Sequence, residues 1–248
     1  MFQNIGEMML LLLRTVRALP QMFRQRQKIY DQLFEIGNAS LLMACVLALF
    51  IGGVIALQTG PVLRERGLQS AVGGLVGLSI CKELAPVMMA ILIAGRIGSA
   101  MAAEIGSMRV YQEIDALRTM NINPVHYLVL PRLIAITISL PVLVLFAILV
   151  GWFGGGLVAV MNEKIGLTFQ SFFVNLRLVV QLGDVLNGLF KSAVFAVIIG
   201  TVCCHQGLVT MGGPRGIGRP VTKAVVNSIV LILILDYFLT RSLLYFEK

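Results

Sequence analysis

Two ionisable residues stand side by side inside an apolar stretch of the chain. Lys82 and Glu83 lie within Leu68–Gly95, and Pro86 follows them. A charge at the centre of a bilayer costs about 2.5–3.5 kcal/mol on insertion scales, so such residues face protein or a water-filled cavity. Neighbouring residues on a helix point about 100° apart, so the two are not expected to pair with each other. Two interpretations stay open: each charge pairs with a neighbouring helix, or both line a polar binding site.

A second pattern with possible chemistry lies in the longest hydrophilic insert, Arg96–Val125. Within it, Ser107–Met120 has helical periodicity, and Asn121 and Pro124 predict where the helix stops. Such a helix either rests on the membrane surface or docks into a groove on a cytoplasmic partner. Its apolar residues recur at i, i+4 and i+7, and its polar residues point elsewhere: Val110, Ile114 and Leu117 against Arg109, Gln112 and Asp115.

Other catalytic or ligand-binding motifs are absent from the sequence. The glycine-rich stretch Gly212–Gly218 follows no strand and lacks the spacing of a nucleotide-binding P-loop, so it predicts a turn. The two histidines, His126 and His205, form no H-E-x-x-H motif. We therefore expect no catalytic residue, no metal site and no cofactor on this chain. The cysteines lie in apolar runs and are expected to be small buried hydrophobes: Cys45, Cys81, Cys203 and Cys204.

The composition indicates what must hold these residues in place. Of 248 residues, 58% are hydrophobic and 13% are charged, whereas soluble domains carry about 25% charged residues. The mean hydropathy is +0.90. These values exclude a soluble enzyme with one core, a disordered chain and a disulfide scaffold. The net charge of +8 comes from basic residues in short gaps between apolar runs, which argues against nucleic-acid binding. The sequence predicts a polytopic membrane protein.

About five transmembrane helices are expected, because a bilayer core takes about 20 apolar residues as a helix. The fold class is therefore an all-α membrane protein. Glycines spaced four apart, Gly73 with Gly77 and Gly151 with Gly155, predict close contacts between helices. The predicted spans are Asn38–Gln58, Leu68–Gly95, Leu128–Met161, Asn187–Val209 and Val221–Phe246.

The 19 basic residues other than Lys82 predict the orientation. With a cytoplasmic N-terminus, 12 of them lie inside and 7, including Lys191, lie outside, so the C-terminus is expected outside. Within residues 1–37, the apolar run Ile5–Leu19 is too short and too basic to cross, and the segment predicts helices in the cytoplasmic interface. In that segment Met22 and Ile29 recur at helical spacing against Arg24 and Lys28. The domain division is thus 1–37, an interfacial segment, and 38–248, the transmembrane part.

Four stretches carry a family resemblance. Residues 95–135, GRIGSAMAAEIGSMRVYQEIDALRTMNINPVHYLVLPRLIA, resemble the hallmark region of MlaE-type permeases, the membrane subunits of MCE-associated ABC transporters. The likeness continues through FIGGVIALQ at 50–58, KELAPV at 82–87 and LDYFLT at 235–240.

The resemblance implies a homodimeric permease in the bacterial inner membrane that moves phospholipids or other lipids between the inner and outer membranes. It implies a cytoplasmic ABC ATPase that binds the ATP, a periplasmic MCE-domain ring and often a small STAS-domain protein. It also assigns residues. Gln58, Lys82 and Glu83 match the lipid cavity, and the ATPase-coupling helix at 107–120 includes Arg109, Val110, Gln112, Glu113, Ile114, Asp115, Leu117 and Arg118.

Two functions from other classes stay open on the residues alone. One is a secondary transporter driven by an ion through Glu83 and Lys82, although such folds usually show internal repeats and we find none. The other is a membrane scaffold that transports nothing. Some relatives carry an aromatic residue outside the first span, whereas this chain has Arg64, Glu65 and Arg66. The headgroup preference of a lipid cavity is therefore left open.

Overall fold

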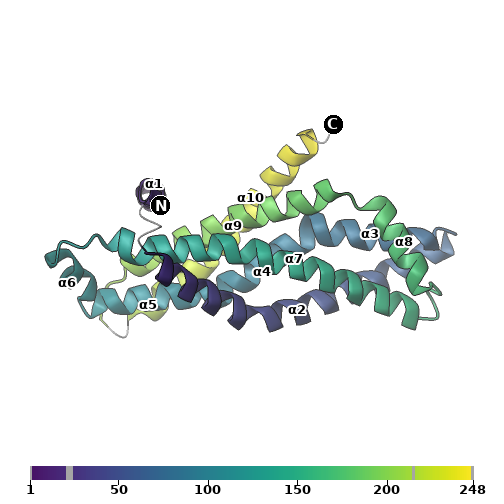
Figure 1. The fold of residues 1–248 in the computed structure, drawn as a ribbon, viewed down its shortest axis with the longest axis horizontal. Helices are drawn as coiled ribbons and strands as arrows, with labels where there is room; N and C mark the ends of the chain where they lie inside the picture. Colours follow the sequence, from purple (N-terminus) through teal and green to yellow (C-terminus); the bar gives the residue numbers. More distant parts are fainter. Residues whose placement is uncertain (1, 21–24, 214–215, 247–248) are drawn as a thin grey trace. The chain divides into compact units, whose positions relative to one another are not determined.

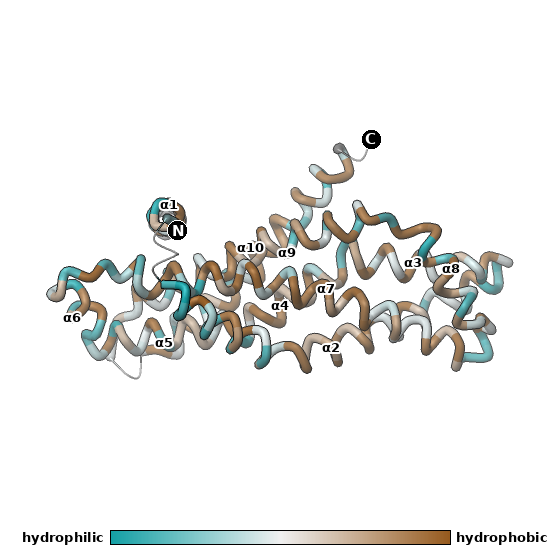
Figure 2. Tube along the Cα trace, viewed as in Figure 1, coloured by the Kyte–Doolittle hydropathy of each residue, from teal (hydrophilic) through white to brown (hydrophobic). Residues whose placement is uncertain are grey.

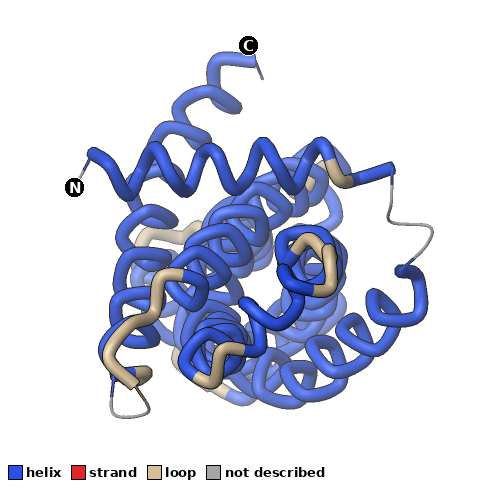
Figure 3. Tube along the Cα trace, turned by 90° about the vertical axis from the view of Figure 1, so that its left-hand side faces the viewer, coloured by secondary structure: helices blue, strands red, loops and turns tan. Residues whose placement is uncertain are grey.

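The computed structural model describes residues 2–20, 25–213 and 216–246, and within these ranges the regular structure is entirely helical (Figure 3). The predicted all-α class is confirmed. The main helices appear in Figure 1 in this order: α1 Phe2–Arg17, α2 Arg26–Glu65, α3 Val72–Ser79, α4 Ala85–Ile93, α5 Ser99–Val110, α6 Glu113–Thr119, α7 Leu130–Met161, α8 Phe169–Val179, α9 Leu182–Leu208 and α10 Gly218–Phe246.

Short helical segments of other kinds join some of these helices. The π-helices are η3 Ile80–Leu84, η4 Ala94–Gly98 and η5 Val125–Val129, and a 3-10 turn, η2, covers Gln69–Ala71. A π-turn inserts one residue into the helix and shifts the faces of the residues around it. Two of the three π-helices, η3 and η5, carry residues that the sites described below use.

The described residues contain five helices long and apolar enough to cross a membrane, as predicted. Figure 2 shows hydrophobic residues along these helices and hydrophilic ones around α6. The helices begin and end at different residues from those that hydropathy predicts: Arg26–Glu65, Gln69–Val110, Val125–Met161, Leu182–Leu208 and Gly218–Tyr245.

The second of these helices is longer than predicted, because it continues beyond Gly95 to Val110. At 1.5 Å per residue its 42 residues extend about 63 Å, twice the thickness of a hydrocarbon core. A helix is held by backbone hydrogen bonds, which form between polar residues as well as between apolar ones, so it can continue past the end of the apolar run. Arg96 begins the hydrophilic insert, yet it lies inside η4 and donates to the carbonyl of Ala39. Hydropathy therefore finds where the apolar surface ends but not where the helix ends.

The N-terminal segment differs from its predicted form in one respect. α2 runs without interruption from Arg26 to Glu65, so the predicted boundary after residue 37 is not the end of a helix. Met22 and Arg24, which contributed to the predicted interfacial pattern, lie outside the described residues. In α1, Leu11 and Thr15 are buried, whereas Met9, Leu10, Leu13 and Val16 are exposed. The interfacial position of this segment stays a prediction.

The helices form two compact units, to which α2, α4, α7 and α9 each contribute residues. The first unit consists of Met1–Ala39, Ala90–Leu140 and Ala193–Lys248. The second consists of Ser40–Met89 and Pro141–Ser192.

Glycines make the close helix contacts of the second unit. A Cβ atom on Gly73 would lie 2.2 Å from the carbonyl oxygen of Phe172, so α3 and α8 touch backbone to backbone. A Cβ on Gly77 would lie 2.7 Å from a methyl carbon of Val180. α2 and α7 come equally close at Gly52, where a Cβ would lie 2.0 Å from the carbonyl oxygen of Gly151, and a Cβ on Gly155 would lie 2.9 Å from a methyl carbon of Val76. The predicted role of the glycine pairs is confirmed.

Candidate functional site

Lys82 and Glu83 lie on η3, and both form ion pairs with α9 in the second unit. The Nζ atom of Lys82 lies 2.9 Å from Oδ1 of Asp184. The Oε2 atom of Glu83 lies 2.9 Å from Nζ of Lys191. Asp184 and Lys191 are seven residues apart, which is two turns, so they lie on one face of α9. The interpretation in which each charge pairs with a neighbouring helix is thus what the structure shows. We call these four residues the charge cluster.

The helix backbones come close between the two ion pairs. Gly188 lies one turn after Asp184, and a Cβ there would lie 2.3 Å from the carbonyl oxygen of Cys81. No other residue type leaves room for this approach. The short distance between the backbones brings adjacent residues of η3 within reach of the same face of α9.

Pro86 explains why Lys191 makes a second contact. Proline has no N–H, so it cannot donate to the carbonyl four residues earlier, which belongs to Lys82. The Nζ atom of Lys191 donates to that carbonyl at 3.0 Å. A charged donor thus satisfies the carbonyl that Pro86 leaves free. The ammonium group of Lys191 therefore bridges a carboxylate and a backbone oxygen on the same segment.

Asp184 also has two roles. α8 ends at Val179 and α9 begins at Leu182, so the chain breaks its helix between them. The backbone N–H of Gln181 donates to Oδ2 of Asp184 at 2.9 Å, which is the reciprocal bond of a capping box. One carboxylate thus caps the start of α9 and pairs with Lys82. Its negative charge also suits the positive end of the α9 dipole.

The four side chains differ in burial in a systematic way. On α9, Lys191 is 3% exposed and Asp184 is 10% exposed, whereas on η3 Lys82 is 31% and Glu83 is 40% exposed. The α9 charges are therefore enclosed and the η3 charges reach an open surface. The candidate span begins at Gln69. Lys82 lies 13 residues further on, about 20 Å along the helix, and is therefore inside the span. Chemically, the open surface offers an ammonium group to an anion and a carboxylate to a cation.

The structure does not bring all of the predicted cavity residues together. Gln58 is exposed on α2, and among the described residues it makes no hydrogen bond or ion pair with the charge cluster. At the same end of α2, Arg64 donates to the carbonyl of Glu163. Arg64 thus contacts the loop that follows α7, and the role of Gln58 stays a prediction.

Sequence reasoning missed the two α9 residues of the cluster. Lys191 was counted among the basic residues outside the membrane, and this is wrong, because it is buried within α9. Asp184 was not singled out. Their signal was present in the sequence: opposite charges seven residues apart, with a glycine between them, beside an apolar run. Removing one outside charge leaves the direction of the charge bias unchanged.

The second predicted site, Ser107–Met120, is not one continuous helix, and that prediction is wrong. α5 ends at Val110, and α6 covers only Glu113–Thr119. Gln112 has φ of 62°, in the left-handed region, which no helix interior tolerates. The chain therefore turns between the two helices instead of continuing the periodic pattern.

The eight predicted coupling residues lie on both sides of this turn, and they differ in burial. Ile114 is fully buried within the chain, and Val110 and Leu117 are half-buried. Asp115 accepts from Arg109 at 2.7 Å and from Arg118 at 3.2 Å, which ties the end of α5 to α6. Of the eight, Gln112, Glu113 and Arg118 are exposed.

Comparison with known proteins assigns the family. The profile described as "Permease MlaE" matches residues 29–242, which cover every element of both sites. The chain belongs to the MlaE permease family. The family resemblance inferred from residues 95–135 is confirmed, and the chain is a multi-pass membrane protein.

Individual relatives agree with this assignment. A protein described as "Probable ABC transporter permease protein" from Synechocystis is 40% identical over 87% of this chain and 81% of its own length. A relative with the same description from Rickettsia typhi is 38% identical over 87% of this chain and 82% of its own. The "Intermembrane phospholipid transport system permease protein MlaE" of Haemophilus influenzae is 35% identical over 96% of this chain and 91% of its own.

Proposed function

We propose that this chain is the membrane permease subunit of an ABC-type transporter that moves phospholipids or related lipids between the inner and outer membranes. Membership of the MlaE family supports this, as does the printed description of the Haemophilus relative. The observation that carries the proposal is the charge cluster inside an apolar span. Ionisable residues at this depth mark substrate pathways in membrane proteins.

In this proposal the exposed half of the cluster handles the polar end of the lipid. The ammonium group of Lys82 attracts a headgroup phosphate, and the carboxylate of Glu83 attracts a headgroup cation. Asp184 and Lys191 hold these side chains in place when no lipid is present, because each makes an ion pair of 2.9 Å with one of them. A lipid headgroup therefore competes with internal partners of the same chemistry. Gln58 contributes at the mouth of the cavity.

Energy comes from a separate subunit in this proposal. A cytoplasmic ABC ATPase binds and hydrolyses ATP, and the segment from Arg109 to Arg118 docks onto it. Because Ile114 is buried in its own chain, the docking contact comes from the half-buried Val110 and Leu117, with Glu113 and Arg118 at the edge. Ile114 instead holds α6 in position.

The remaining partners follow from the family resemblance. A second copy of the chain completes the lipid path, and a periplasmic MCE-domain ring receives or supplies the lipid. A small STAS-domain protein binds on the cytoplasmic side with the ATPase. The N-terminus lies in the cytoplasm and the C-terminus in the periplasm. Five helices give one chain little room to enclose a lipid, which supports a symmetric pair.

Co-purification tests the class of function. The tagged full-length chain, expressed with its cellular partners, is purified in mild detergent, and a stoichiometric ATP-binding subunit is sought by mass spectrometry. The proposal expects that subunit. A chain that carries none and still moves lipid with an ion gradient is a secondary transporter, and a chain that does neither is a scaffold. Either outcome contradicts the proposal.

The lipid site needs a separate test. Photo-crosslinking amino acids at positions 58, 82 and 83 are expected to capture lipid in the purified complex. Glu83→Gln and Lys82→Gln keep the size of the side chain and remove its charge. If the cluster handles lipid, transport falls while the assembly stays intact. If no lipid is captured at these positions, the site assignment is wrong even though the family assignment stands.

A further inference from the structure

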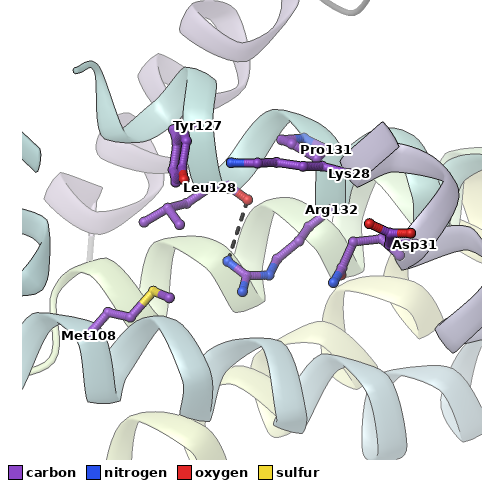
Figure 4. Close-up of a pocket in the computed structure, with 8 residues that line it drawn as sticks. Lys28, Asp31, Met108, Tyr127, Leu128, Pro131 and Arg132 are labelled. Atoms are coloured by element: carbon purple, nitrogen blue, oxygen red, sulfur yellow. Dashed lines mark hydrogen bonds between the residues drawn. The ribbon is translucent and has the colours of Figure 1, made fainter. Parts of the chain in front are cut away.

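A polar pocket lies in the first unit, and none of its lining residues is one that the proposed transport uses. Its volume is about 250 Å³, and α2, α5, η5 and α7 supply its lining. Figure 4 shows Lys28 and Asp31 reaching it from α2, Tyr127 and Leu128 from η5, Met108 from α5 and Arg132 from α7. A second cavity, about 540 Å³, shares Lys28, Asp31 and Tyr127 with it.

The pocket lies where two of the candidate membrane-spanning helices begin. Two candidate spans, Arg26–Glu65 and Val125–Met161, begin beside it. Lys28 is in the first turn of one span and Tyr127 in the first turn of the other. The ends of spans are where phospholipid headgroups meet a membrane protein and where aromatic and basic side chains gather.

Arg132 supplies hydrogen-bond donors to this pocket that the chain itself does not use. Its side chain is 9% exposed, and Nη2 lies 2.8 Å from Oε2 of Glu104. Nη1 makes only a long contact, 3.5 Å, to the carbonyl of Leu128. Nε has no hydrogen-bond partner among the described residues. Nε is too deeply buried for a ligand in the pocket to reach, so Nη1, with its one long contact, is the donor that an anion in the pocket engages.

The neighbouring groups supply one more positive and one negative charge. Nζ of Lys28 lies 3.0 Å from the centroid of the Tyr127 ring, a cation–π contact that keeps the ammonium group at the pocket wall. Asp31, one turn later on α2, also lines both cavities. Gln25 lines the second cavity beside them. Donors for an anion thus stand beside acceptors for a cation.

We propose that this pocket binds the zwitterionic headgroup of a glycerophospholipid that carries a primary ammonium group. Its phosphate accepts hydrogen bonds from Lys28 and Arg132, and its ammonium group donates to Asp31. The bound lipid joins the start of α2 to η5 at the membrane surface. This inference does not depend on the transport function, because a membrane protein of any class can carry such a site.

Photo-crosslinking in nanodiscs tests the site. The full-length chain with a benzophenone amino acid in place of Met108 is reconstituted in equal parts of phosphatidylethanolamine and phosphatidylglycerol with identical acyl chains. Intact mass after illumination identifies the lipid in each adduct. We expect mainly phosphatidylethanolamine adducts. Lys28→Met is expected to lower them about tenfold, since it removes a charged hydrogen bond. The matched control is Arg26→Met, which removes an exposed charge two residues away that does not line the pocket.

Two further arms identify the ligand. Asp31→Asn is expected to abolish the preference for phosphatidylethanolamine over phosphatidylglycerol. Free phosphoethanolamine at millimolar concentration is expected to leave the adducts unchanged, because the membrane keeps the lipid at a far higher local concentration. Adducts that the free compound removes would show a soluble phosphate ester as the ligand. Equal yields from the two lipids, or equal losses in Lys28→Met and Arg26→Met, would also overturn the proposal.

Discussion

Replacing Glu83 by methionine is expected to destabilise the chain more than replacing its partner Lys191. The Lys191 side chain is 3% exposed, so Glu83→Met leaves a buried ammonium group without the carboxylate that lies 2.9 Å away. Breaking a buried ion pair in this way costs about 3–5 kcal/mol. The carbonyl of Lys82 still accepts from Lys191 at 3.0 Å, and Glu83 is 40% exposed, so we expect about 2–3 kcal/mol.

The reverse change leaves a charge that solvent or lipid headgroups reach. Lys191→Met is therefore expected to lower the free energy of unfolding by about 1–2 kcal/mol. For the double variant Glu83→Met/Lys191→Met we expect a free energy of unfolding within about 1 kcal/mol of the wild type, because apolar side chains of similar size replace the pair. The double variant is thus more stable than Glu83→Met alone.

Unfolding of the purified chain in mixed micelles, followed by circular dichroism as the denaturing detergent increases, measures these differences. Glu163→Met is the control, since Glu163 is exposed in the loop after α7, and its effect is expected within about 0.5 kcal/mol. If the double variant loses as much stability as the two single variants added together, the two charges do not interact, and our reading of the cluster fails.

Three further predictions follow from the packing and the topology. Gly73→Ala is expected to lower the free energy of unfolding by about 1–3 kcal/mol, because its Cβ would lie 2.2 Å from a backbone oxygen of α8. A Cβ on Gly37 meets no described atom within 4 Å, so Gly37→Ala is expected to be neutral or stabilising in the same unfolding assay. Ile114→Asp is expected to lower the melting temperature of the chain itself, whereas Leu117→Asp is expected to leave it folded and release the ATPase on affinity purification; the opposite pattern would contradict the burial of these residues. Reporter fusions are expected to place the loop after α6 in the cytoplasm and the C-terminus outside, and a cytoplasmic C-terminus would contradict five crossings.

Hydropathy predicted the helical class and the number of spans because the bilayer imposes a length and a polarity on each crossing. The glycine pairs were likewise readable, since close helix contacts in membranes need small residues at fixed spacing. Both features depend on local sequence alone. The pattern therefore predicted that Gly73 makes a close helix contact, but it did not predict that the contact is with Phe172.

The features that local pattern missed depend on residues far apart in the chain. Lys82 and Asp184 form an ion pair although they are about 100 positions apart in the chain. The sequence of either segment alone does not predict that they are partners. The turn at Gln112 was hidden because a left-handed residue leaves the apolar periodicity on both sides of it intact. Ile114 belonged to that periodicity, yet it packs against its own chain. Amphipathic spacing identifies an apolar face but not what covers it.

ATP-dependent lipid transfer tests the central claim most directly. The chain is reconstituted into liposomes with its co-purified ATPase and MCE-domain partners, and movement of fluorescent phospholipid to acceptor vesicles is measured with ATP and with a non-hydrolysable analogue. We predict transfer that requires hydrolysis and falls severalfold in Lys82→Gln and Glu83→Gln complexes that remain assembled. Transfer at the wild-type rate in both variants would contradict a lipid-handling role for the charge cluster.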